Sequence, residues 1–302
     1  MTSDLLAIGE AMAEIRRSPE AGFAISYAGD TLNTAIYCAR CLPESKSTAY
    51  LTRIGTDPLS KSFIETAEKE GLVSDFIETD PDHNIGIYAV STDATGERSF
   101  SYWRNDSAAR QLFSAKQIEL PKARIVYLSG ITLAILPQLV REKLLSKLKL
   151  IKSEGESLIA FDSNYRPALW ENIETAQSVM SSMWEIADIA LPSVDDEMAL
   201  FVESDEDSVI SRFASKSWTA CAIKRGSNGP VSPTLAASEH PEFEPAKIVT
   251  DTTGAGDSFN GAYLAAFLRG HSEEQCLMSG HEMAAKVVGV RGAIMAKNAQ
   301  AQ

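Results

Sequence analysis

The residues with the clearest chemical potential in this 302-residue sequence stand together at Gly254-Ala255-Gly256-Asp257. The two glycines permit a tight turn with bare backbone N–H groups. At the start of a helix, such groups suit the negative charge that grows on a phosphate during transfer. A carboxylate there would repel phosphate, so Asp257 needs a role, and deprotonating an attacking hydroxyl group is a good one. The alternative is a turn that only packs a helix on a sheet, with Asp257 as a cap.

The sequence on either side predicts the elements that hold this turn. Residues 248–250 are apolar or β-branched and predict a strand, and residues 257–268 have the composition of a helix. The turn is therefore expected between the end of a strand and the start of a helix.

The second half of the chain predicts a parallel sheet. Strand-like runs at residues 125–129, 158–161 and 189–191 alternate with helix-like runs at 137–152 and 173–187. This alternation is typical of α/β folds, whose ligands bind beyond the carboxyl ends of the strands. The segments at those ends are polar, and we expect them to converge on a phosphate-handling site: residues 162–167, 193–197, 224–229 and the glycine turn.

A second polar group lies near the N-terminus. A strand is expected at residues 5–8, and a helix opens at Gly29-Asp30-Thr31-Leu32-Asn33 with polar side chains in its first turn. Several polar groups at a helix start indicate recognition of hydroxyl groups. Capping by Asp30 or Thr31 is the alternative, and it explains one polar residue but not Asn33.

Residues 85–91 and 98–103 alternate in polarity and are joined by a turn-like segment at 92–97, which predicts a β-hairpin. The period of a strand puts Tyr102 and Arg104 on one face, and Tyr88 lies on a face of the partner strand. Such a hairpin could cover an anionic ligand. Edge aromatics with a solvated arginine are the alternative.

Composition excludes several kinds of partner. The formal net charge is -13, and the sequence pI is about 4.9, so the phosphates of nucleic acids and anionic membranes would be repelled. No apolar run is long enough to span a membrane. The four cysteines are scattered, which favours reduced thiols and a cytoplasmic protein. A small-molecule partner is therefore expected.

Residues 249–261 resemble the second signature of the PfkB, or ribokinase-like, carbohydrate kinase family, and residues 29–35 resemble the first. The resemblance covers essentially the whole chain. It implies an α/β, ribokinase-like fold for residues 1–302, with a mostly parallel central sheet flanked by helices. The lid, a small β-sheet, would take its strands from about residues 10–28 and 85–105.

The motifs on the substrate side, at residues 95–105, 127–136 and 162–167, are most similar to the branch of the family that phosphorylates the 6-hydroxyl of 2-keto-3-deoxygluconate. This implies Asp257 as the catalytic base and Gly254, Ala255 and Gly256 as the anion hole. It also implies that arginine charge and tyrosine hydroxyl groups meet the carboxylate of the substrate. The implied substrate-binding residues are Gly29, Asp30, Asn33, Tyr88, Tyr102, Arg104, Arg166 and Asp257.

The resemblance further implies ATP and Mg²⁺, with K⁺ as an additional cation near Asp251 and Thr253. For Asp251, capping of the turn is the alternative. Asp196 would position Mg²⁺ through water, but the usual Asn-x-x-Glu motif begins with Ser193 here, which leaves the magnesium shell open. The implied ATP contacts are Asn164, Arg166, Ser193, Lys224, Gly226, Gly229, Gly254 and Gly256.

Two other functions remain open at this stage: a kinase of another sugar, such as fructose or ribose, and an inactive sensor of sugar acids. Arg104 and Arg166 favour an acidic sugar, and the intact turn with Asp257 favours an active enzyme. A homodimer through the lid is also expected, because an exposed two-stranded ribbon is marginally stable alone.

Overall fold

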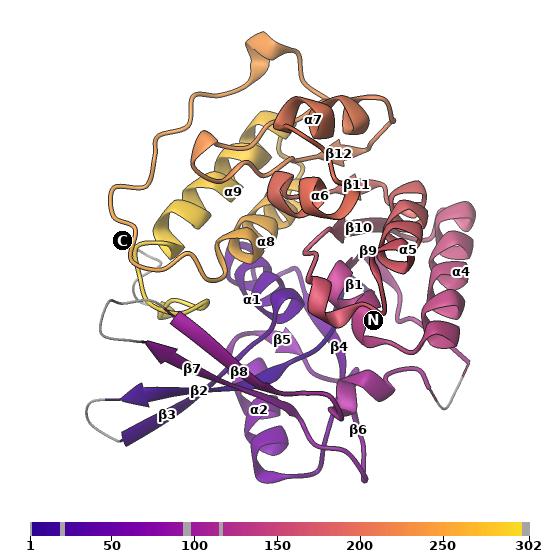
Figure 1. Ribbon diagram of the computed structural model, residues 1–302, viewed down its shortest axis with the longest axis vertical. Helices are drawn as coiled ribbons and strands as arrows, with labels where there is room; N and C mark the ends of the chain where they lie inside the picture. Colours follow the sequence, from indigo (N-terminus) through magenta and orange to yellow (C-terminus); the bar gives the residue numbers. More distant parts are fainter. Residues whose placement is uncertain (1, 19–21, 93–97, 115–116, 298–302) are drawn as a thin grey trace.

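The computed structural model describes residues 2–18, 22–92, 98–114 and 117–297, and Figure 1 shows a large α/β body with a small sheet beside it. The large sheet has the order β12-β11-β10-β9-β1-β4-β5, and β6 pairs with β4. All of these pairs are parallel, which confirms the predicted fold class. The strands are β1 (Ser3–Ile8), β4 (Thr48–Ile54), β5 (Leu72–Val73), β6 (Ile77–Thr79), β9 (Ala123–Ser129), β10 (Leu158–Asp162), β11 (Ile189–Ala190) and β12 (Ala220–Cys221).

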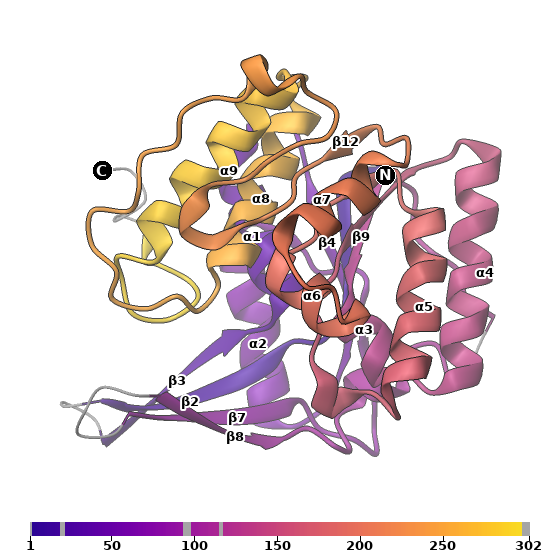
Figure 2. The same ribbon diagram turned by 45° about the horizontal axis from the view of Figure 1, so that its top comes forward.

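Alternate residues of β1 face two helical layers, which lie on opposite sides of the sheet in Figure 2. Leu5 and Ala7 join one apolar cluster with α1, α2, α8 and α9, and Leu6 and Ile8 join another with α3 to α7. Burial of both faces explains why these strands read as continuous apolar runs. The helices are α1 (Asp30–Cys41), α2 (Pro58–Lys69), α3 (Gly130–Ile135), α4 (Gln138–Glu154), α5 (Ile173–Ile186), α6 (Val194–Phe201), α7 (Glu206–Ala214), α8 (Ala255–Leu268) and α9 (Glu273–Val287).

The small sheet has the order β3-β2-β7-β8. Strand β2 is antiparallel to β3 and parallel to β7, and β7 and β8 form the predicted hairpin. β2 begins four residues after the carboxyl end of β1, and β3 leads directly into α1, so the small sheet starts at the carboxyl edge of the large one. Its strands are β2 (Met12–Ser18), β3 (Gly22–Ala28), β7 (Gly86–Thr92) and β8 (Arg98–Trp103).

The predicted strand at residues 248–250 is wrong. This segment is irregular, and the side chains of Ile248 and Val249 are 67% and 65% exposed. The backbone N–H groups of Thr250 and Asp251 donate to the carbonyl oxygen of Val288, at 2.7 and 3.1 Å. The end of α9, and not a neighbouring strand, therefore holds the chain that leads into the glycine turn.

Most of the predicted hairpin turn, residues 93–97, lies outside the described residues. Four short 3-10 helices complete the regular structure that the described ranges show: Ala108–Gln111, Pro167–Leu169, Gly226–Asn228 and Ala237–Glu239. Within the same ranges, no helix has the length and apolar character that crossing a membrane requires.

Candidate active site

The glycine turn forms the start of α8. Gly254 is the N-cap residue with φ of 76°, and a Cβ atom there would lie 2.8 Å from the Cα of Ala293, so a side chain does not fit. Asp257 lies in the first turn of the helix. Its Oδ2 accepts a hydrogen bond from Asn33 Nδ2 of α1 at 2.8 Å. The carboxylate is therefore fixed beside the backbone N–H groups of the turn.

The surroundings of Asp257 favour its neutral form. Removal of the carboxyl group from water, followed by the negative charge of Asp30, raises its pKa to about 8, and Asp162 acts in the same direction. The hydrogen bond from Asn33 and the charge of Lys224 oppose the rise. A carboxyl group with a pKa near the working pH is suited to accept a proton during a reaction.

The start of α1 meets the ends of two strands of the large sheet. Asp30 Oδ2 accepts hydrogen bonds from Ser129 Oγ, at the end of β9, and from Asn164 Nδ2, which follows β10, the latter at 3.0 Å. Asn33 Oδ1 accepts a hydrogen bond from the N–H group of Gly29 at 3.4 Å. The structure thus brings the predicted residues Gly29, Asp30, Asn33, Asn164 and Asp257 together.

A buried polar cluster lies next to Asp257, and sequence reasoning gave an individual role only to its Lys224. Lys224 Nζ lies 3.0 Å from Asp162 Oδ1 and 3.0 Å from Asn260 Oδ1. Asn260 Nδ2 donates to Asp162 Oδ2 at 2.7 Å and to the hydroxyl of Tyr127 at 3.2 Å. Asp162 was inside a strand-end segment that the sequence singled out, and Asn260 was inside the signature at residues 249–261, but neither was given a role.

The predicted tyrosines of the small sheet are neighbours. Tyr88 and Tyr102 are paired across β7 and β8, with ring centroids 5.8 Å apart. Tyr88 is buried and donates its hydroxyl to Glu14 Oε2 at 2.5 Å, while Tyr102 is 53% exposed. Glu14 therefore fixes the hydroxyl of Tyr88, whereas the ring of Tyr102 faces solvent.

Arg104 is buried in an ion pair that the sequence did not reveal. Its Nη2 contacts Glu10 Oε2, and Ser107 Oγ donates to Glu10 Oε1 at 2.5 Å. The Nε of Arg104 is buried without a hydrogen-bond partner among the described residues. Glu10 is two residues beyond the end of β1, so inspection of the end of the first strand would have found it.

Arg166 stands apart from this pair. Its side chain is about half exposed, and its Nη1 donates to the carbonyl of Tyr165 at 2.8 Å and to Asp196 Oδ1 at 3.2 Å. Burial raises the pKa of Asp196, and the charge of Arg166 opposes that rise. Ser193 donates its N–H group to Ser163 Oγ at 3.0 Å. Arg166, Ser193 and Asp196 therefore lie along the segments that follow β10 and β11.

The predicted glycines after β12 form a tight turn. Gly226 and Gly229 have φ of 56° and 73°, and a Cβ atom at Gly229 would lie 2.6 Å from the ring of Phe243. Gly226 is exposed and Gly229 is buried against Phe243, so the loop that begins with Lys224 turns tightly at these two positions.

Two positions were predicted to hold cations. Asp251 Oδ1 accepts the N–H group of Thr253 at 3.1 Å, and its Oδ2 accepts that of Gly292 at 2.5 Å, which is the geometry of a carboxylate that fixes a turn. Among the described residues, no group of three or more histidine, cysteine, aspartate or glutamate side chains could hold a metal. Asp196 fits Mg²⁺, because this ion commonly binds through one or two carboxylates, phosphate oxygens and water.

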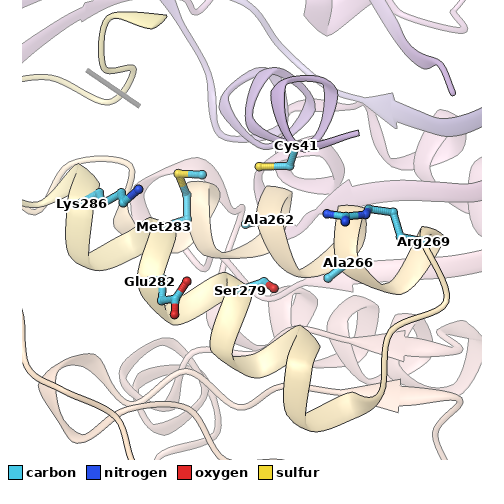
Figure 3. A pocket seen from close by; sticks show the side chains of 8 residues that line it. All are labelled: Cys41, Ala262, Ala266, Arg269, Ser279, Glu282, Met283 and Lys286. Atoms are coloured by element: carbon cyan, nitrogen blue, oxygen red, sulfur yellow. The ribbon is translucent and has the colours of Figure 1, made fainter. Parts of the chain in front are cut away.

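A hollow of about 170 Å³ lies between α1, α8 and α9, and Figure 3 shows Arg269, Lys286 and Cys41 around it. None of the predicted site residues lines this hollow. It lies against Ala262 and Ala266, in the later turns of α8, so we place the active site from the strand ends and the glycine turn instead.

Together, the parallel sheet with its helical layers, the small sheet and the glycine turn beside Asp257 define a carbohydrate kinase. The pfkB family carbohydrate kinases match residues 2–299, and the chain belongs to this family. It is therefore a phosphotransferase that binds a sugar and a nucleotide, and membership implies ATP and a divalent metal as cofactors.

Individual relatives point to one branch. The chain is 38% identical over 303 residues to 2-dehydro-3-deoxygluconokinase of Dickeya dadantii, with 97% of each chain covered. It is 37% identical over 298 residues to the enzyme of that name from Haemophilus influenzae, covering 96% of this chain and 95% of that one. The fold is similar to that of a fructokinase from Vibrio cholerae O395 bound to fructose, ADP and calcium ion. That likeness has a TM-score of 0.82 and 21% identity, and it covers 98% of this chain and 96% of that one.

Proposed function

We propose that the protein phosphorylates 2-keto-3-deoxy-D-gluconate, also called 2-dehydro-3-deoxygluconate, at its 6-hydroxyl. The phosphoryl donor is ATP with Mg²⁺, and the products are 2-keto-3-deoxy-6-phosphogluconate and ADP. The 2-dehydro-3-deoxygluconokinases that are 37% and 38% identical over nearly their full length support this substrate. The chain would form one kinase domain, with the small sheet as its lid.

Asp257 is the base in this proposal. It accepts the proton that O6 loses as the bond from O6 to the γ-phosphorus forms and the bond from that phosphorus to the departing ADP breaks. The N–H groups of Gly254 to Gly256 stabilise the negative charge on the transferring group. Asp30 and Asn33 contact hydroxyl groups of the sugar acid, and Gly29 lets its backbone approach them.

The choice of an acidic sugar rests on one observation about the described residues, which is the unpaired Nε of Arg104. Its Nε is a buried donor without a partner in the described part of the chain, and such a group costs about 1–3 kcal/mol unless something accepts its hydrogen bond. A substrate carboxylate would accept it. Glu10 already pairs with Arg104, so the substrate carboxylate would share the guanidinium group with Glu10. Arg166 and the hydroxyl of Tyr102 would assist, while Tyr88, whose hydroxyl donates to Glu14, would contribute its ring.

The nucleotide would lie along the strand ends that follow β10, β11 and β12. Asp196 would hold Mg²⁺ through water, and the ion supplies positive charge that offsets the charge on the phosphates. K⁺ near Asp251 and Thr253 would support the glycine turn. The residues that would contact ATP are Asn164, Arg166, Ser193, Lys224, Gly226, Gly229, Gly254 and Gly256.

The outer face of the lid supports a homodimer. Phe23, Ile25 and Trp103 are 64%, 54% and 61% exposed, and the register of the four strands places them on the same face. Contact with the lid of a second copy would bury this face. Light scattering at micromolar concentration should show a dimer, and Ile25→Lys should yield a monomer. A monomeric wild-type protein would contradict this part of the proposal.

Analysis of the product tests the reaction itself. Purified protein incubated with ATP, Mg²⁺ and 2-keto-3-deoxygluconate should give ADP and a product whose phosphorus resonance couples to the protons at C6. Asp257→Asn serves as the control for a contaminating kinase. Absence of phosphorylation, or phosphate on another carbon, would contradict the proposed function.

A further inference from the structure

Three side chains from distant parts of the chain form a closed triangle at the carboxyl edge of the sheet. Lys224, after β12, contacts Asp162, at the end of β10, and Asn260, in α8, with both distances 3.0 Å. Asn260 and Asp162 close the triangle at 2.7 Å. The Lys224 side chain is 12% exposed, and Asn260 and Asp162 are almost completely buried. Each buried polar group therefore has a partner within the cluster.

The triangle lies next to the parts that carry the proposed reaction. Asn260 is three residues after Asp257, about one helical turn away. A Cβ atom on Gly256 would lie 3.9 Å from Lys224 Nζ, so the ammonium group stands beside the anion turn. Thr34 adds a second link, because its Oγ1 donates to the carbonyl oxygen of Asp257 at 3.1 Å and lies 3.2 Å from the hydroxyl oxygen of Tyr127.

We propose that Lys224, Asp162 and Asn260 are positioning residues that fix the first two turns of α8 on the sheet and keep a positive charge beside Asp257. This inference rests on the proposed role of Asp257 as the base. It goes beyond the ATP contact proposed for Lys224, because the carboxylate of Asp162 and the carboxamide of Asn260 already hold the ammonium group in place without a nucleotide.

The charge of Lys224 matters because the other charged and titratable groups around Asp257 are acidic or neutral. Asp30 and Asp162 raise the pKa of Asp257, and Lys224 lowers it. Burial raises the pKa of each nearby tyrosine, so these remain neutral. The groups that face Asp257 are Asp30 and Tyr37 of α1, Tyr88 of β7, Tyr127 of β9, Asp162 of β10 and Lys224 after β12.

The test is the pH profile of kcat/KM for the sugar acid, which reports groups of the free enzyme. Lys224→Met should move the midpoint of the acidic limb upward by about half a pH unit or more, because a nearby opposite charge favours the ionised carboxylate. Lys224→Arg keeps the charge, so the midpoint of its acidic limb should lie close to that of the wild type. Asn260→Leu should lower kcat, but by less than the roughly 10²- to 10⁴-fold that loss of the general base itself costs, and should change the midpoint less than Lys224→Met does.

Lys149→Met is the matched control, because Lys149 lies exposed on α4 and its loss removes the same formal charge. Thermal unfolding of every variant identifies any that fails to fold. If Lys224→Met fails, Lys224→Gln takes its place, because it removes the charge but keeps a polar side chain for Asp162 and Asn260. A wild-type midpoint in both Lys224 variants, with only the KM for ATP raised, would overturn the inference. The proposed function would survive that result, whereas it would fail if the wild-type enzyme left 2-keto-3-deoxygluconate unphosphorylated.

Discussion

Replacing Arg104 by methionine, which has similar length and no charge, should weaken binding of the sugar acid and also destabilise the fold. Loss of a charge-assisted hydrogen bond costs roughly 1.5–3 kcal/mol, or about 10- to 150-fold in KM for the sugar acid. The KM for ATP should change little. Removing one partner of a buried ion pair typically costs about 3–5 kcal/mol of stability, because Glu10 stays buried with only the bond from Ser107.

A double variant separates these two effects. Glu10→Gln with Arg104→Met removes both charges, so the free energy of unfolding in urea should recover part of the loss while the raised KM persists. Steady-state ADP release at pH 8 gives KM, and denaturation of the same samples gives stability. A folded Arg104→Met protein with the wild-type KM for the sugar acid would refute the assignment of Arg104 to the substrate carboxylate.

Three further predictions follow from the same site. Asp257→Asn should keep the fold and ATP binding measured by calorimetry, but lose roughly 10²- to 10⁴-fold in kcat, and turnover near that of the wild type would remove Asp257 from the mechanism. Because the pKa of Asp257 in the folded protein is about 8 and that of an unfolded aspartate about 3.9, the folded state holds a proton that the unfolded state loses between these values. The protonated Asp257 side chain therefore contributes to stability at low pH, and this contribution is lost as pH rises towards 8. Asp257→Asn should consequently raise the unfolding temperature more at pH 9 than at pH 4. Exchange of K⁺ for tetramethylammonium at fixed ionic strength should lower kcat several-fold, and an unchanged kcat would assign Asp251 to capping alone.

Local sequence patterns predicted the fold well, because burial on both faces leaves an unmistakable series of apolar strands and amphipathic helices. The rule that ligands meet the carboxyl ends of parallel strands also located Asn164 and Lys224, and the structure places both in the polar cluster around Asp257 and Asp30. The approach to the glycine turn was mispredicted. Ile248 and Val249 have the residue types of a strand, but no strand in the described part of the chain pairs with them, and both side chains are exposed.

The partners of the site residues were the part that the sequence could not show. Glu10 and Arg104 are 94 positions apart, and Asp162 and Asn260 are 98 positions apart. No periodicity connects such positions, since their contact depends on how β1, β10, α8 and the small sheet are stacked. This matters for function, because the sequence suggested an unpaired Arg104, whereas the structure pairs its charge with the buried carboxylate of Glu10.

The most direct test of the central claim is the ratio of kcat/KM for 2-keto-3-deoxygluconate to that for fructose, measured with the wild-type enzyme under identical conditions. A site that uses a buried arginine to bind a carboxylate should prefer the acid by about 10-fold or more, since one charge-assisted bond alone contributes roughly 1.5–3 kcal/mol. Equal use of the two sugars would contradict the assignment to an acidic substrate and leave only the family's general activity as a sugar kinase.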